Sequence, residues 1–134
     1  MPSAIPIPIT ALYLAIFAVF AGFLAFLPGK IRGSSGISIG DGGRPDLLLA
    51  MRRHANFVEY VPYFMLMFAA LELNGSGAML LHILGLGMIF ARTMHAIGIK
   101  ADTIQSTPRG IGAGLTLLFT LVAAVVLVMQ FLKA

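Results

Sequence analysis

The chain has 134 residues, of which 59% are hydrophobic and only 10% are charged. Soluble domains carry about 25% charged residues, so this composition excludes an ordinary soluble domain and indicates a single-domain integral membrane protein. The formal net charge of +4 comes from nine basic residues that are scattered between apolar segments, which excludes the contiguous basic patch of a nucleic-acid-binding surface.

Four segments are apolar and approach the roughly 20 helical residues that a bilayer core requires. The first covers about residues 9–27 and contains no charge before Lys30. It lacks the basic n-region of a secretory signal, so we expect a retained membrane span. The stretch 28–44 is rich in glycine and serine, and we expect it to form a loop that covers one end of the bundle.

The second segment, about residues 45–73, differs from the others because it contains a polar cluster. An ionised side chain at the centre of a membrane helix costs roughly 2.5 to 3.5 kcal/mol, so such a cluster implies a function. Spacings of four and three residues place Arg52, Asn56 and Glu59 on one helix face, and Tyr63 continues this stripe. We expect Glu59 to be buried between helices and paired. The cluster consists of Arg52, Arg53, His54, Asn56 and Glu59.

The third segment, about residues 78–97, follows a turn of glycine, serine and asparagine. Arg92 and His95 are three residues apart and therefore share a face near its end. His82 stands alone among apolar residues, and we expect it to make an interhelical hydrogen bond.

The fourth segment, about residues 107–132, begins with Thr107 as the predicted N-cap and Pro108 at the first helical position. Arg109 follows directly. We expect it to lie at the same depth as the basic groups of the second and third segments, so that three helices contribute basic groups at one level. Lysine and arginine gather beside the first and third loops, which predicts that both loops are cytoplasmic and that the termini face the other side.

The types of chemistry available to these residues are limited. The chain has no cysteine, so sulfur chemistry would require a ligand. Three separated histidines, His54, His82 and His95, lack the spacing of a zinc motif, so we expect no metal site. Several guanidinium groups with one carboxylate and one amide suit a zwitterionic anion, such as a short acidic peptide.

Two structural interpretations remain open for the charged residues. Arginines and lysines near the ends of spans commonly reach phosphate headgroups, and Arg53 and Lys100 are the best candidates for this role. A purely structural ion pair would account for Arg52 and Glu59 together. It would leave Arg92 and Arg109 unexplained.

The pattern Arg52-x-x-x-Asn56-x-x-Glu59-Tyr60-x-Pro62, followed by Phe90-Ala91-Arg92 and Arg109, resembles the MAPEG family, the membrane-associated proteins in eicosanoid and glutathione metabolism. The resemblance covers nearly the whole chain. It implies an all-α bundle of four transmembrane helices that forms a homotrimer in the membrane, here a bacterial inner membrane. It also implies a glutathione transferase or peroxidase that acts on a lipophilic electrophile or hydroperoxide arriving from the membrane lipid.

The resemblance also implies roles for particular residues. Arg109 would be the catalytic residue that stabilises the glutathione thiolate. Glutathione, as co-substrate, would contact residues on three helices and in the first loop, namely Arg32, Arg52, Asn56, Glu59, Tyr60, Arg92 and His95.

This chain departs from the family pattern at two positions. Ile99 stands where several members have a tyrosine, and Gly110 stands where prostaglandin E synthase has a serine, which argues against prostaglandin isomerisation. Two alternative functions remain: a non-catalytic lipid-binding scaffold of the same fold, and a small four-span transporter. A transporter of this kind would carry an acidic residue in its first span, and this chain has none there.

Overall fold

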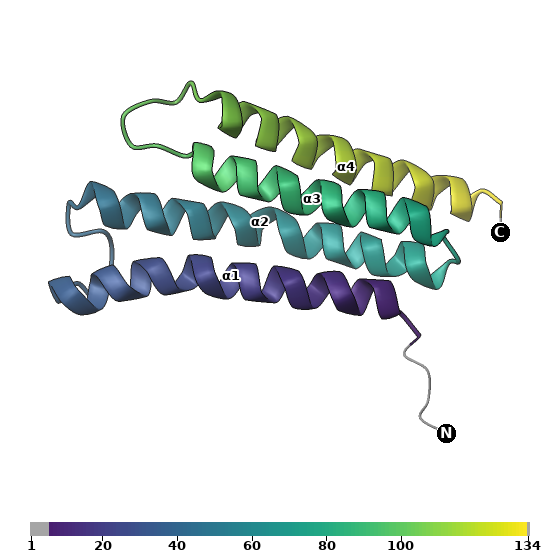
Figure 1. Ribbon diagram of the computed structural model, residues 1–134, viewed down its shortest axis with the longest axis horizontal. Coiled ribbons are helices and arrows are strands. Elements are labelled where there is room, and N and C mark those ends of the chain that lie inside the picture. Colours follow the sequence, from purple (N-terminus) through teal and green to yellow (C-terminus); the bar gives the residue numbers. More distant parts are fainter. Residues whose placement is uncertain (1–5, 134) are drawn as a thin grey trace.

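The computed structural model describes residues 6–133, and this part of the chain forms four α-helices and no strand. The helices lie side by side and antiparallel, with both termini at one end of the bundle (Figure 1). The loops from α1 to α2 and from α3 to α4 lie together at the other end (Figure 1). The predicted all-α architecture is therefore confirmed. The helices are α1 (Pro8–Ser35), α2 (Pro45–Leu73), α3 (Ala78–Gly98) and α4 (Thr107–Phe131).

Three of these helices, α1, α3 and α4, are long and apolar enough to cross a membrane. Helix α2 has 29 residues and is the longest, but it carries the polar cluster. It also packs against all three other helices. Arg53, His54 and Asn56 of the cluster are partly buried against protein neighbours, whereas Arg52 and Glu59 are exposed.

The first helix is longer than the sequence predicted. Residues 28–35 were expected to begin a loop, but α1 continues through Pro28 and ends at Gly36, whose φ of 68° gives a left-handed cap. Packing outweighs the weak helix propensity of glycine and serine here, because Arg32 Nη2 lies 3.3 Å from Met51 Sδ on α2. The first loop is therefore only residues 36–44, and Lys30 and Arg32 lie on α1.

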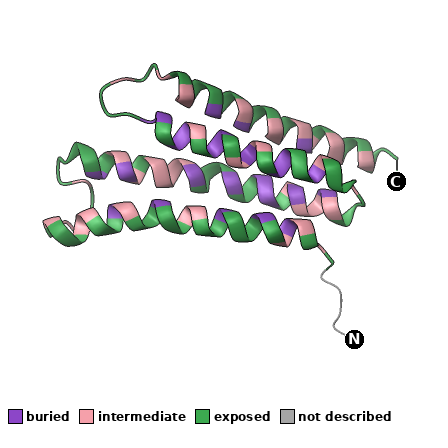
Figure 2. Ribbon diagram, viewed as in Figure 1, coloured by how far each residue is buried: buried purple, intermediate pink, exposed green. Residues whose placement is uncertain are grey.

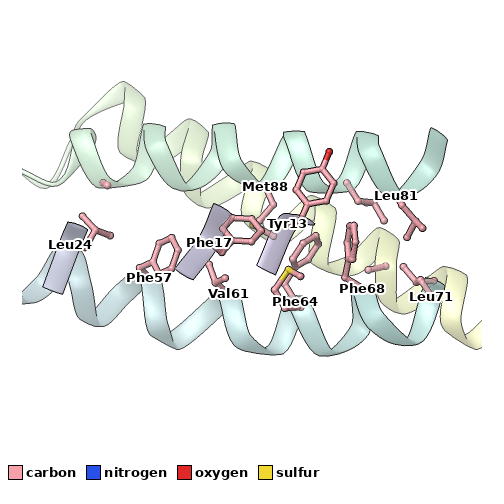
Figure 3. Packing of buried hydrophobic residues seen from close by; sticks show 14 residues of the cluster. Tyr13, Phe17, Leu24, Phe57, Val61, Phe64, Phe68, Leu71, Leu81 and Met88 are labelled. Atoms are coloured by element: carbon pink, nitrogen blue, oxygen red, sulfur yellow. The ribbon is translucent and has the colours of Figure 1, made fainter. Parts of the chain in front are cut away.

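The core is a cluster of aromatic and aliphatic side chains, most of them from α1, α2 and α3 (Figure 3). The inward faces of the helices are buried and the outward faces are exposed and apolar (Figure 2). Phe20 of α1 and Phe57 of α2 have ring centroids 4.9 Å apart, which is a favourable aromatic contact. Tyr13 packs on Gly85 of α3, where any Cβ would overlap its ring. The Tyr13 Oη lies 3.0 Å from His82 Nδ1, which confirms the predicted interhelical hydrogen bond.

An acidic side chain near the end of α2 caps the start of α1. Glu72 accepts hydrogen bonds from the backbone N–H of Ile9 at 2.9 Å and of Thr10 at 2.6 Å. Helix α1 has no side-chain cap of its own at Ile7. The carboxylate therefore satisfies two of the N–H groups that a helix start leaves open, and its charge complements the helix dipole.

We expect Glu72→Gln to destabilise the protein by about 0.5–2 kcal/mol, because the amide keeps one acceptor but removes the charge at the helix start. The free energy of unfolding in detergent measures this loss, and hydrogen exchange of the first turn of α1 should rise. Asp102→Asn removes an acidic charge at the other end of the bundle and serves as the control. Unchanged exchange at Ile9 and Thr10 would contradict the capping role.

Candidate functional site

A cavity of about 400 Å³ opens at the end of the bundle that carries the α1–α2 and α3–α4 loops. Helix α2 forms one side, the end of α3 and the start of α4 form the other, and the first loop contributes its last residues. Five of the eight predicted site residues line this cavity. They are Arg52, Asn56, Glu59, His95 and Arg109.

The stripe on α2 faces the cavity as its spacing predicted, but Glu59 differs from expectation. Arg52 and Glu59 are both exposed on the single chain. Within residues 6–133, the one ion pair is between Arg44 and Asp46, at 2.8 Å. The expected burial and pairing of Glu59 is therefore wrong for the single chain, and so is a structural ion pair with Arg52. The structure leaves both charges available to a ligand.

Arg92 does not line the cavity but lies directly behind it. Its side chain is only 2% exposed, and its Nη2 donates a hydrogen bond of 2.6 Å to Asn56 Oδ1. Its Nη1 donates to Thr116 Oγ1 at 3.3 Å, and its guanidinium lies 5.5 Å from the centroid of the Tyr60 ring, as in a cation–π contact. Because Asn56 Oδ1 is occupied, the Asn56 amide N–H groups are the ones left for a ligand in the cavity.

Close backbone contact between α3 and α4 sets the positions of His95 and Arg109. A Cβ at Gly98 would overlap the backbone of Arg109, and a Cβ at Gly112 would overlap the backbone of His95 and Ala91. His95 is 6% exposed, lines the cavity, and its Nδ1 has no hydrogen-bond partner among residues 6–133. Small residues thus allow the helix approach that places both side chains at one cavity wall.

The start of α4 differs slightly from the prediction. Ser106, and not Thr107, is the N-cap residue, and it makes no side-chain capping bond. Thr107 and Pro108 occupy the first turn, where the missing N–H of proline is harmless. Among the three glycines that follow Arg109 in the first turns of α4, only Gly112 packs closely on α3, because a Cβ at Gly110 or Gly114 would meet open space.

We expect Gly98→Ala to push α4 away from α3, because the overlapping atoms belong to the Arg109 backbone and cannot rotate aside. Overpacking of this kind costs about 1–3 kcal/mol, measured as a lower free energy of unfolding in detergent. Gly114→Ala is the matched control on the open face of α4, and it should be neutral. Equal free energies of unfolding for Gly98→Ala and Gly114→Ala would show that the contact between Gly98 and the Arg109 backbone can relax.

Besides Arg92, two more predicted site residues lie outside the cavity lining. Arg32 belongs to α1, where its Nη1 donates to the Ile37 carbonyl oxygen at 3.4 Å. Tyr60 is 50% exposed and stacks on Arg92 from outside the cavity. On the single chain these two residues and Arg92 therefore stand apart from the five that share the cavity.

The cavity also contains residues that the sequence interpretation missed. Asp41, Arg44 and Lys100 add charges from the loops, and Leu48, Leu49 and Ile99 add apolar wall. The residues at positions 45, 48, 49 and 52 repeat with helical spacing. Extending the α2 stripe toward its N-terminus would therefore have identified the leucines and the loop residues beside them.

The chemistry of the lining suits a small zwitterionic anion. The cavity brings together the four cations Arg44, Arg52, Lys100 and Arg109 with the two carboxylates Asp41 and Glu59. Asp46 already neutralises Arg44. Guanidinium groups bind carboxylates in bidentate fashion, and a carboxylate accepts from an ammonium group. The volume falls within the 300–1,000 Å³ that is typical of sites for small molecules.

The sequence of the chain is similar to a protein family and to two named bacterial proteins. A sequence model described as the MAPEG family matches residues 10–129 of the chain. The chain is 29% identical over 116 residues to the Inner membrane protein YecN of Escherichia coli strain K12, covering 87% of this chain and 88% of that relative. The YecN protein of Escherichia coli O6:H1 matches with the same identity and coverage.

Proposed function

The chain belongs to the MAPEG family, and on this premise we propose that it is a glutathione-dependent transferase or peroxidase of the bacterial inner membrane. The proposal rests above all on one observation. Arg52, Asn56, Glu59, His95 and Arg109, contributed by three helices, line a single cavity at the end of the bundle. Three apolar helices and the inner-membrane relative support the location.

The donors and acceptors in the cavity fit glutathione, a tripeptide with two carboxylates, one ammonium group and two amides. Arg52 is exposed toward the cavity and can hold a carboxylate. Glu59 has no ion-pair partner among residues 6–133 and can accept from the ammonium group. The free amide N–H groups of Asn56 can donate to a peptide carbonyl, and His95 adds a further polar side chain to the lining.

Bound glutathione supplies a thiol that becomes nucleophilic when it is ionised, toward an electrophilic carbon or a hydroperoxide oxygen. A free thiol has a pKa of about 8.5 and is largely protonated at neutral pH. Arg109 contributes a positive charge, and the start of α4 contributes its helix dipole. The first turn of α4 contains no acidic residue that would offset them. An opposite charge within about 4–6 Å lowers a pKa by roughly 1–3, so this wall favours ionisation.

A homotrimer would complete this site. Arg52 and Glu59 are exposed on one chain, as are Tyr63 at 71% and Leu66 at 71% on the same helix. We propose that a neighbouring subunit covers this face of α2 and thereby closes the cavity. The same contact would give Glu59 the burial that the single chain lacks. Native mass spectrometry of the detergent-solubilised protein tests the stoichiometry directly.

The orientation follows from the distribution of basic residues, with the first and third loops in the cytoplasm, where glutathione is present. A membrane electrophile or hydroperoxide would then reach the cavity from the bilayer, past the leucines of its wall. Ile99, in place of the tyrosine of several relatives, lines the cavity and adds apolar surface instead of a hydroxyl. Conjugation and peroxide reduction remain two variants of one proposal, because both need the same ionised thiol.

The activity is tested in proteoliposomes with glutathione and either a lipophilic aryl halide or a fatty-acid hydroperoxide. We expect glutathione-dependent turnover of at least one of them, lost in Arg109→Ala and retained in Lys133→Ala. Binding of fatty acid without turnover would favour the scaffold alternative. Proton-dependent flux of a solute without glutathione would favour the transporter.

A further inference from the structure

A second cavity, of about 330 Å³, lies between α1 and α3 and shares no lining residue with the first. It opens on the outer surface of the bundle, because Phe23 is 60% and Ile97 is 55% exposed. We call it the α1–α3 groove. One apolar wall is formed by Phe20, Phe23 and Leu27 of α1, the other by Ala96 and Ile97 of α3, and Arg53 of α2 closes it.

Arg53 is a cation with few protein partners in this apolar setting. Its Nη2 donates to the Ile99 carbonyl oxygen at 2.9 Å, while its Nε is buried without any hydrogen-bond partner. No acidic side chain within residues 6–133 pairs with it. A guanidinium carries five N–H donors, and a charge beside apolar side chains is costly unless an anion or water satisfies it. An anion at the Arg53 end of the groove would accept from the Nη N–H groups that the Ile99 carbonyl oxygen does not use.

In a bilayer that the helices span, the groove would lie near the level where headgroups meet acyl chains. Arg53 is eight residues beyond the start of α2, roughly 12 Å along its axis, and Ile97 is next to the last residue of α3. This is the end of the bundle that bears most lysines and arginines. Lys30 lies two turns beyond Phe23 along α1 and is exposed. The groove therefore becomes basic toward the headgroup region and apolar toward the bilayer centre.

We propose that the α1–α3 groove binds one anionic phospholipid, with the phosphate at Arg53 and an acyl chain along Phe23, Leu27 and Ile97. The aromatic and aliphatic walls require an acyl chain, which a free phosphate ion lacks. The groove lining contains no carboxylate, so it offers nothing to the ammonium group of a zwitterionic lipid. Charge complementarity thus favours an anionic headgroup. This inference is independent of glutathione binding.

The test uses delipidated full-length protein in detergent, with binding of phosphatidylglycerol and phosphatidylcholine of identical acyl chains followed by native mass spectrometry. We expect a preference of about fivefold for phosphatidylglycerol, because both lipids present a phosphate to Arg53 but only phosphatidylglycerol carries a net negative charge. Arg53→Gln should remove the preference, Arg53→Lys should keep it, and Lys133→Gln at the other end of the bundle should leave it unchanged. Inorganic phosphate should not compete.

Ala96→Leu provides a second test that leaves the charge in place. The larger side chain should narrow the groove and weaken binding of both lipids while the preference between them stays. Equal affinity of the wild-type protein for the two lipids, or an unchanged preference in Arg53→Gln, would overturn the proposal. The chain has no cysteine, so Phe23→Cys introduces a unique thiol; a disulfide between two copies of this variant would also overturn it, by showing that a second subunit occupies the groove.

Discussion

Arg109→Ala should reduce glutathione-dependent turnover about 10²- to 10³-fold, the effect expected when one preorganised charge at a reacting group is lost. Arg109 lines the cavity at the start of α4, and its backbone is held against Gly98. The backbone of Arg109 is therefore held at the cavity wall, from which its side chain can reach the region where the thiol must ionise. Its loss should raise the pKa of the bound thiol and move the pH profile of turnover to higher pH. Glutathione affinity should change much less.

Two substitutions control for this prediction. Arg109→Lys keeps a positive charge and should retain most of the shift in the pH profile. Arg44→Ala removes another cavity arginine, but one that Asp46 already neutralises, and should leave the profile in place. The ultraviolet absorbance of the bound thiolate provides a direct measurement. Equal thiolate absorbance in the wild-type and Arg109→Ala proteins would refute the role of Arg109.

Arg92→Met should weaken glutathione binding about 10- to 100-fold although Arg92 lies behind the cavity. The guanidinium holds Asn56 Oδ1 at 2.6 Å and so turns the amide N–H groups toward the ligand. Without this bond the Asn56 side chain can rotate, and the cavity loses a fixed donor. The loss should appear in glutathione affinity measured by calorimetry. Stability should change less, because methionine removes a buried charge together with its hydrogen bonds.

Thr116→Val is the matched control for the Arg92 prediction. It is nearly isosteric and removes the hydrogen bond of 3.3 Å from Arg92 Nη1 and the bond of 2.7 Å from Thr116 Oγ1 to the Gly112 carbonyl oxygen. The bond from Arg92 to Asn56 stays, so glutathione affinity should stay within a few-fold of the wild-type value. Affinity that is unchanged in Arg92→Met would show that Asn56 does not depend on Arg92. An equally large loss in both variants would indicate a general disturbance of the α3–α4 packing.

The sequence predicted the helical architecture and much of the cavity because both follow from helical periodicity. The spacing of Arg52, Asn56 and Glu59 placed them on one face of α2, and the structure puts this face on the cavity. The prediction that basic groups from three helices meet at one end is confirmed for Arg52, His95 and Arg109. These features depend on helical periodicity, which the spacing of residues along the sequence shows directly.

Contacts between helices were harder to predict. No pattern in the sequence indicates that Glu72 caps α1, because Glu72 is 63 residues from Ile9 and 62 residues from Thr10. Arg92 was expected to contact the ligand, but its burial and its bond to Asn56 depend on how α3 packs on α2. The helical conformation of residues 28–35 also reflects packing, which overrode a composition typical of loops.

The most direct test of the account is a calorimetric titration of glutathione into the purified protein in detergent. We expect saturable binding, weakened at least about tenfold in Arg52→Ala and in Glu59→Gln, because each substitution removes one partner of a charge-assisted contact. Lys133→Ala, at the opposite end of the bundle, should bind like the wild-type protein. Absence of binding, or equal affinity in all four proteins, would contradict the claim that this cavity holds glutathione.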